Sequence, residues 1–144
     1  MKPRVLILCT GNSARSQMAE AILRRMAGDK LEVFSAGTEP RPVHPLAIRV
    51  MSEIGIDISK ARSKHVGEFL GQHFSYIITV CDKAERSCPV FPGLSKRFHK
   101  GFEDPAISEG TDEERLALFR RVRDEIRMWL EDWCKGISES EPLF

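Results

Sequence analysis

Short apolar runs alternate with longer amphipathic stretches along this chain. Three runs, at residues 5–8, 31–36 and 76–80, are too compact for helices and are bounded like buried strands. Residues 97–102 carry a poorer version of the same pattern. The apolar positions therefore predict three buried strands and a weaker fourth strand.

Helical spacing of apolar residues fills the segments between these strands. It predicts helices at residues 13–27, 45–54 and 66–70, of which the first ends at Gly28 and the second at Gly55.

A long last helix begins at a capping box made by Thr111 and Glu114. The tail at residues 138–144 is expected to be frayed. The residues expected on the buried face of this helix are Leu116, Phe119, Val122, Ile126, Leu130 and Trp133.

Strands that alternate with helices indicate a parallel sheet covered on both faces. A chain of 144 residues is long enough to bury the core of one domain. The sequence therefore predicts an α/β fold with a single domain over residues 1–137, built on a four-stranded parallel sheet with helices on both faces. In such sheets the functional site lies at the carboxyl ends of the strands.

Charge and composition exclude several classes of partner. The 22 basic and 21 acidic residues give a net charge of +1, which implies no general attraction to nucleic acid or membranes. No apolar run is long enough for a membrane span, and the N-terminus lacks the apolar stretch of a signal peptide. We therefore expect a cytoplasmic protein whose four cysteines begin as thiols.

The first strand turns into the first helix through small polar residues. Such a turn directs free backbone N–H groups at one point, and the helix dipole adds partial positive charge there. A cysteine in this field is favoured as a thiolate, and an arginine can hold a tetrahedral oxyanion through its planar fork. The turn therefore predicts a nucleophile in an oxyanion-binding loop, formed by Cys9, Thr10, Gly11, Asn12, Ser13, Ala14 and Arg15.

The spacing of Cys9 and Arg15 also arises by chance, and a buried cysteine at a strand end is commonly a packing residue. The position in the chain favours the functional interpretation. Gly11 stands where the backbone must approach a ligand, and Ser13 is a ready N-cap for the helix. We interpret Cys9 as the nucleophile.

Two further cysteines follow the third strand, Cys81 directly and Cys88 seven positions later. If this segment were helical, their Cα atoms would be roughly 10.5 Å apart, whereas a disulfide needs about 4.4–6.8 Å. Pro89 and Pro92 make the chain that follows a poor helix, so the thiols could exist both separated and bridged. This predicts a redox relay; a zinc site that includes His99, or two inert thiols, are the alternatives.

Two other residues carry weaker signals. Cys134 shares the apolar face of the last helix with Leu130, which favours a packing role. Asp104 precedes a proline in the loop after the fourth strand, where a carboxylic acid could protonate a departing oxygen. Because Asp-Pro is also a common turn opener, this residue alone does not decide the chemistry.

The chain carries six motifs of a known family, namely CTGNSARSQMAE, SAGTEP, HPLAI, VCDKAERSCP, GFEDPA and RVRDEI. With these motifs it resembles the thioredoxin-coupled arsenate reductases, which share the low-molecular-weight protein tyrosine phosphatase fold. The resemblance covers nearly the whole chain. The pair Cys81 and Cys88 marks the reductases, whereas the loop and Asp104 are common to both groups.

The resemblance implies a mechanism that begins at the loop. Cys9 would attack arsenate held by the loop amides and Arg15, and Asp104 would protonate the leaving oxygen. Ser16 would help to keep Cys9 ionised. Phosphate or sulfate would also fit the loop.

The resemblance further implies a relay of three thiols. Cys81 would attack Cys9 and release arsenite, and Cys88 would then move the disulfide outward to the pair Cys81 and Cys88. Thioredoxin would reduce that disulfide, and no tightly bound cofactor is expected.

Two positions depart from the family pattern. Ala14 stands where many relatives carry another cysteine, which none of the implied steps uses. Some relatives hold potassium with residues that correspond to Asn12, Glu20 and Ser35 and with an acidic residue where this chain has Lys64. We expect the lysine ammonium to replace the ion, which makes activity indifferent to potassium; a solvated Lys64 is the alternative.

Three functions are compatible with these residues. The first is an arsenate reductase that works as a monomer, with no nucleic-acid or membrane partner. The second is a small tyrosine phosphatase, although such relatives carry aromatic residues where this chain has Ala106 and Ile107. The third is a sensor whose thiols only report oxidation.

Overall fold

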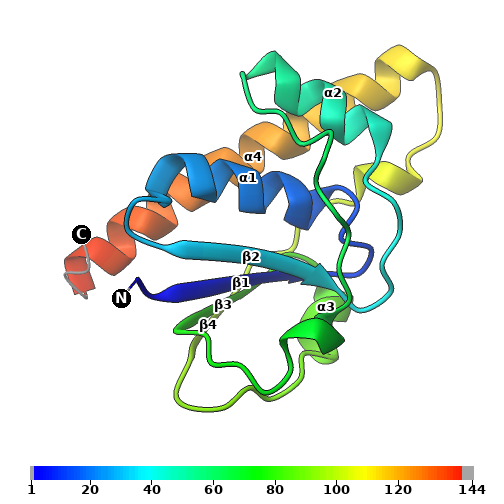
Figure 1. Cartoon of the computed structure of the whole chain (residues 1–144). Helices are drawn as coiled ribbons and strands as arrows, with labels where there is room; N and C mark the ends of the chain where they lie inside the picture. The colour runs from blue at the N-terminus through cyan, green and yellow to red at the C-terminus, as the bar shows by residue number, and fades with distance from the viewer. Residues whose placement is uncertain (1, 141–144) are drawn as a thin grey trace.

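The computed structural model describes residues 2–140. Strands and helices alternate along the chain, as predicted (Figure 1). The segment between Cys81 and Cys88 contains a short helix, α3. The elements are, in chain order, β1 (Arg4–Cys9), α1 (Arg15–Ala27), β2 (Glu32–Gly37), α2 (Pro45–Glu53), the 3₁₀ helix η1 (Val66–Phe69), β3 (Tyr76–Thr79), α3 (Asp82–Arg86), β4 (Lys96–His99), the 3₁₀ helix η2 (Pro105–Ile107) and α4 (Asp112–Ser140).

The four strands form one parallel sheet in the order β2-β1-β3-β4, which confirms the predicted architecture. β1 is an inner strand, where Leu6 lies opposite Phe34 of β2 and Ile77 of β3. β4 is an edge strand and is mostly exposed. Because only strands buried on both faces are continuous apolar runs, the sequence pattern of β4 is the weakest of the four.

Helices cover both faces of the sheet. The two long helices, α1 and α4, lie on one face, and α2 packs against α4 (Figure 1). On this face Trp133 of α4 stands edge-on to Tyr76 of β3, with 5.4 Å between the ring centroids. On the other face α3 packs against β1 and β3, and the rings of Phe69 and Phe74 contact Phe34 of β2.

The first helix begins two residues later than predicted. α1 starts at Arg15, and its N-cap residue, Ala14, forms no side-chain capping bond. The carbonyl of Ser13 accepts a hydrogen bond from the backbone N–H of His44 at 2.9 Å, and the carbonyl of Ala14 accepts the bond from Met18. Ser13 therefore belongs to the loop, and the prediction that it caps the helix is wrong.

The last helix begins with the predicted capping box. The Glu114 backbone N–H donates to Thr111 Oγ1 at 3.1 Å, and the Thr111 backbone N–H donates to Glu114 Oε1 at 3.3 Å. α4 continues to Ser140, so residues 138–140 of the predicted tail are helical in the structure; residues 141–144 lie outside the described residues.

Within residues 2–140, no helix combines the length and the apolar character that crossing a bilayer would require.

Candidate active site

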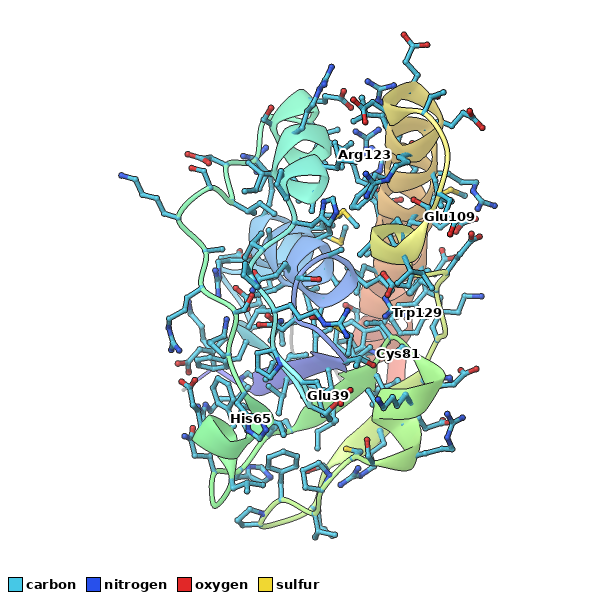
Figure 2. All side chains as sticks on the ribbon, turned by 90° about the vertical axis from the view of Figure 1, so that its right-hand side faces the viewer. Glu39, His65, Cys81, Glu109, Arg123 and Trp129 are labelled. Atoms are coloured by element: carbon cyan, nitrogen blue, oxygen red, sulfur yellow. The ribbon has the colours of Figure 1, made fainter. Side chains whose placement is uncertain are left out.

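A pocket of about 500 Å³ opens at the carboxyl ends of the strands, where the fold predicts a site. Figure 2 looks onto this end of the molecule, with Cys81 at the start of α3 and Glu39 on the loop that follows β2. The pocket is lined by Cys9, Thr10, Gly11, Ser13, Ala14, Arg15, Arg41, Pro42, His44, Lys83, Asp104, Ala106 and Ile107.

Asn12 determines the shape of the loop between β1 and α1. Its φ of 48° is a left-handed conformation that asparagine tolerates better than most residues. The buried side chain donates to Ser16 Oγ at 2.7 Å and to Ser35 Oγ at 2.9 Å. It accepts hydrogen bonds from Gln17 Nε2 at 3.1 Å and from the backbone N–H of Lys64 at 2.9 Å. Two donors and two acceptor positions are therefore all satisfied, which fixes the loop in place.

The Cys9 thiol lies on the floor of the pocket and is 2% exposed. Its sulfur is 2.8 Å from Ser16 Oγ and accepts a hydrogen bond from the Asn12 backbone N–H at 3.2 Å. Burial raises the pKa of the Cys9 thiol, whereas Ser16, the Arg15 guanidinium and the Asn12 amide act in the opposite direction. The sulfur is therefore desolvated yet surrounded by donors, an arrangement that suits a nucleophile.

Arg15 and Asp104 face each other across the pocket wall. Arg15 Nη2 is 3.4 Å from Asp104 Oδ2, and Arg15 Nη1 donates to the carbonyl of Phe102 at 3.2 Å. Asp104 Oδ1 accepts a hydrogen bond from the Ala106 backbone N–H at 3.0 Å, which orients the carboxyl group. Cys9, Arg15 and Asp104, the three residues singled out from the sequence, thus line the same pocket.

Cys81 lies behind the loop, where β3 ends next to β1. Its sulfur is 3.3 Å from Thr10 Oγ1 and accepts a hydrogen bond from the Ala84 backbone N–H at 3.4 Å. The thiol is buried and contacts the residue that follows Cys9. The structure therefore places the second thiol against the loop that carries the first.

Cys88 follows the far end of α3 and is partly buried. Its sulfur accepts a hydrogen bond from Arg97 of β4 at 2.8 Å. The four cysteines are free thiols, and helix α3 separates Cys81 from Cys88. His99, the residue considered for zinc, is hydrogen-bonded to Asp82 of α3 at 2.9 Å.

A polar network behind the loop includes the position that departs from the family pattern. Ser35 Oγ donates to Glu20 Oε1 at 2.6 Å, and Lys64 Nζ is 3.6 Å from the same oxygen. Lys64 Nζ also donates to the carbonyl of Arg62 at 2.9 Å. The Lys64 side chain is 14% exposed, so it is a partly buried partner of Glu20 and not a solvated residue.

Comparison with known proteins places this site in a family. Residues 4–142 match the family of low molecular weight phosphotyrosine protein phosphatases. The chain belongs to this family. One relative, an arsenate reductase of Halalkalibacterium halodurans, is 50% identical over 125 residues, which is 87% of this chain and 90% of the relative.

Solved structures of arsenate reductases share the fold of this phosphatase-family member. One, in a phosphate-binding state, has a TM-score of 0.74 and 33% identity, and the match covers 96% of this chain and all of the other. A thioredoxin-dependent arsenate reductase of Corynebacterium glutamicum has a TM-score of 0.72 and 31% identity, over 97% of this chain and 64% of the other.

Three basic residues in the pocket of this family member were not predicted. Arg41 and His44 come from the loop after β2, and Lys83 of α3 forms an ion pair with Glu39 at 2.5 Å. Burial, together with nearby Arg115, lowers the pKa of His44, so its imidazole is neutral at pH 7. The rule that loops meet at the carboxyl ends of parallel strands could have indicated the loop, but not which side chains turn inward.

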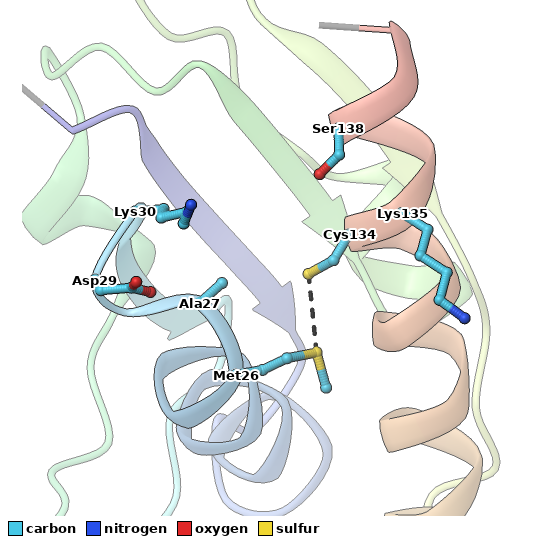
Figure 3. A pocket seen from close by; sticks show the side chains of 7 residues that line it. All are labelled: Met26, Ala27, Asp29, Lys30, Cys134, Lys135 and Ser138. Carbon is cyan, nitrogen blue, oxygen red and sulfur yellow. Dashed lines mark hydrogen bonds between the residues drawn. The ribbon is translucent and has the colours of Figure 1, made fainter. Parts of the chain in front are cut away.

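Cys134 lies in a separate pocket between α1 and α4 (Figure 3). Its sulfur is 3.8 Å from Met26 Sδ. Burial raises the pKa of the Cys134 thiol to about 11, so the thiol stays protonated at neutral pH. These contacts support the packing role.

Proposed function

We propose that this protein reduces arsenate to arsenite through a relay of Cys9, Cys81 and Cys88, and that thioredoxin restores the thiols. The observation that carries the proposal is the 3.3 Å contact between the Cys81 sulfur and Thr10 Oγ1, with Cys88 at the other end of the same short helix. Hydrolysis of a phosphate ester has no use for two such thiols. The identity to proteins named arsenate reductases supports the activity, and the likeness to a thioredoxin-dependent one supports the donor.

In the first step the Cys9 thiolate attacks the arsenic of arsenate. Arg15 and the loop N–H groups bind the remaining oxygens. Asp104 gives a proton to the leaving oxygen, which departs as water. Ser16, 2.8 Å from the sulfur, stabilises the thiolate before the attack. The product is an adduct with a bond between sulfur and As(V).

In the second step the Cys81 thiolate attacks the sulfur of Cys9 in this adduct. A disulfide between Cys9 and Cys81 forms, and the electron pair of the sulfur–arsenic bond passes to arsenic. Arsenic is thereby reduced from As(V) to As(III) and leaves as arsenite. The two thiols supply the two electrons.

In the third step Cys88 attacks Cys81, the bond between Cys9 and Cys81 breaks, and its electron pair returns to Cys9. α3 spans Asp82–Arg86, between the two thiols. A helix continued over both cysteines would hold their Cα atoms roughly 10.5 Å apart, whereas a disulfide needs about 4.4–6.8 Å. α3 must therefore unwind during this step. The new disulfide forms at a partly exposed position, where a thioredoxin dithiol can reach it.

The residues beside the loop do not fit a potassium ion. A cation, Lys64 Nζ, already lies 3.6 Å from Glu20 Oε1 and is bonded to the carbonyl of Arg62. We propose that this ammonium group replaces the ion, because it neutralises the Glu20 carboxylate.

The function is tested by the consumption of NADPH in the presence of thioredoxin, thioredoxin reductase and arsenate. The wild type and the control Cys134→Ser should turn over repeatedly, whereas Cys81→Ser and Cys88→Ser should stop after at most one turnover. Sustained turnover by Cys81→Ser would refute the relay.

A phosphatase is the second candidate, because the pocket also suits phosphate. Ile107, 72% exposed beside the pocket, offers no aromatic ring for a phosphotyrosine. Hydrolysis of p-nitrophenyl phosphate should be weak, should survive in Cys81→Ser and should be absent in Cys9→Ser. We propose that the enzyme works as a monomer.

A further inference from the structure

The guanidinium of Arg97 contacts two adjacent residues that follow α3. Its Nη1 donates to Cys88 Sγ at 2.8 Å, and its Nη2 donates to the carbonyl of Pro89 at 3.1 Å. Arg97 lies on the exposed edge strand β4, at a distance along the sheet from the oxyanion loop on β1. None of the steps at Cys9 uses this side chain.

We propose that Arg97 is a positioning residue that holds Cys88 as a thiolate, ready to attack Cys81. This inference rests on the proposed relay, because only the relay makes Cys88 a nucleophile.

The chemistry of the two groups supports this role. A neutral thiol is a weak hydrogen-bond acceptor, whereas a thiolate beside a guanidinium makes a charge-assisted hydrogen bond. Arginine stays charged at every relevant pH, so the contact favours the ionised sulfur. The second bond of the fork, to Pro89, fixes the backbone next to the thiol and so orients the sulfur.

In the described structure, the charged side chains of α3 do not contact the Cys88 sulfur. On α3, Glu85 is 3.6 Å from His99 of β4, and Arg86 is exposed. The Cys88 sulfur accepts a hydrogen bond from Arg97 at 2.8 Å and, as a neutral thiol, donates a longer one to the Pro89 carbonyl at 3.6 Å, so ionisation gives up only the longer contact. Arg97 is therefore the cation placed to act on this sulfur.

The contact also explains how the segment is released. When the Cys88 sulfur bonds to Cys81, its negative charge passes through the broken disulfide to Cys9. A disulfide sulfur is neutral and accepts hydrogen bonds weakly, so the bond from Arg97 loses its strength. The hydrogen bond from Arg97 to Cys88 is thus strong before the third step and weak after it.

The test is a single turnover without thioredoxin, in which the reduced protein is mixed with arsenate, quenched at intervals by acid and alkylation, and mapped by peptide mass. Wild type, Arg97→Gln, Arg97→Lys and the control Arg86→Gln are compared. Arsenite should form at the same rate in all four. In Arg97→Gln at pH 7, conversion of the Cys9–Cys81 disulfide to the Cys81–Cys88 disulfide should slow about fivefold, the effect of an exposed charge pair.

The pH dependence separates this role from a merely structural one. The deficit of Arg97→Gln should shrink as the pH rises, because thiols ionise in alkaline solution without a neighbouring cation. Arg97→Lys, which keeps the charge, should recover most of the rate. A deficit that is equal at all pH values, or a rate unchanged from the wild type, would overturn the inference. If the wild type forms neither disulfide nor arsenite, the proposed function fails instead.

Discussion

At the residue scale, the nucleophile depends on a small network beneath the loop. Asn12 bonds Ser16 at 2.7 Å, and Ser16 is 2.8 Å from the Cys9 sulfur. Burial raises the pKa of Cys9, so the hydroxyl of Ser16 is one of the few groups that favour the thiolate. The loop geometry and the charge state of the nucleophile are therefore set by the same side chains.

Ser16→Ala should slow the formation of arsenite about tenfold, the effect of losing one hydrogen bond to a charged group. Because Ser16 lowers the pKa of Cys9, its loss raises that pKa, and the rising limb of the pH–rate profile moves to higher pH. The measurement is pre-steady-state arsenite formation between pH 6 and 9. Ser52→Ala, an exposed hydroxyl on α2, is the control. An unshifted profile in Ser16→Ala would contradict the assigned role.

The position of the Lys64 ammonium leads to a prediction about how turnover and stability respond to potassium and sodium. Turnover and thermal unfolding should be the same in potassium and sodium salts at equal ionic strength, because a cation is already fixed at Glu20. Lys64→Asp removes that cation and adds a carboxylate, so its unfolding temperature should rise in potassium more than in sodium. A large stimulation of the wild type by potassium would show that the lysine does not replace the ion.

Cys134 should be the slower of the two partly buried thiols to react. With a pKa of about 11, roughly one thiol in a thousand is ionised at pH 8. Iodoacetamide at that pH should therefore label Cys88 well before Cys134, as followed by peptide mass. Equal rates of labelling would argue against the buried, protonated thiol.

At the element scale, α3 is the part that must change. It has five residues, and two of its bonds are the Glu85 N–H to the Cys81 carbonyl at 3.2 Å and the Ser87 N–H to the Lys83 carbonyl at 3.1 Å. A single turn of helix is marginal by itself. Tertiary contacts such as His99 with Asp82 hold it against the sheet.

Oxidation to the disulfide between Cys81 and Cys88 should therefore melt α3 alone. Hydrogen exchange by mass spectrometry should show lost protection over residues 82–88 in the oxidised protein, while β1 and α1 keep theirs. Persistent protection of residues 82–88 would mean that the two thiols can bridge without unwinding.

The elements also show how far sequence reasoning reaches. Buried strands such as β1 and β3 were predicted to within a residue or two, because parallel strands covered on both faces are continuous apolar runs. The start of α1 was misplaced because a tertiary bond, from His44 to the Ser13 carbonyl, extends the loop. The contact of Arg97 with Cys88 has no local signal, since it joins an edge strand to a loop nine residues away.

At the scale of the whole molecule, the sheet positions Cys9 and Cys81, and the long helix α4 packs against the sheet. Cys9 is the last residue of β1 and Cys81 follows the adjacent parallel strand β3, so the ladder between β1 and β3 fixes their relative position. Trp133 of α4 packs edge-on against Tyr76 of the inner strand β3 and against Phe98 of the edge strand β4. The rigid part of the site thus depends on the packing of α4.

Trp133→Ala should lower the free energy of unfolding by about 3–5 kcal/mol, the usual cost of truncating a buried aromatic side chain. Trp133→Phe should cost clearly less, because it keeps one aromatic ring in the packing and because in the described structure the indole N–H has no hydrogen-bond partner to lose. Urea denaturation measures both. A Phe variant as unstable as the Ala variant would show that ring packing is not what α4 contributes.

The central claim is that Cys81 attacks the sulfur of Cys9 and thereby reduces arsenic. The most direct measurement is a single turnover of Cys88→Ser with one equivalent of arsenate, followed by arsenite analysis and disulfide mapping. The account predicts one arsenite per protein and a trapped disulfide between Cys9 and Cys81. Arsenite without that disulfide, or a fully reduced protein with no arsenite, would contradict it.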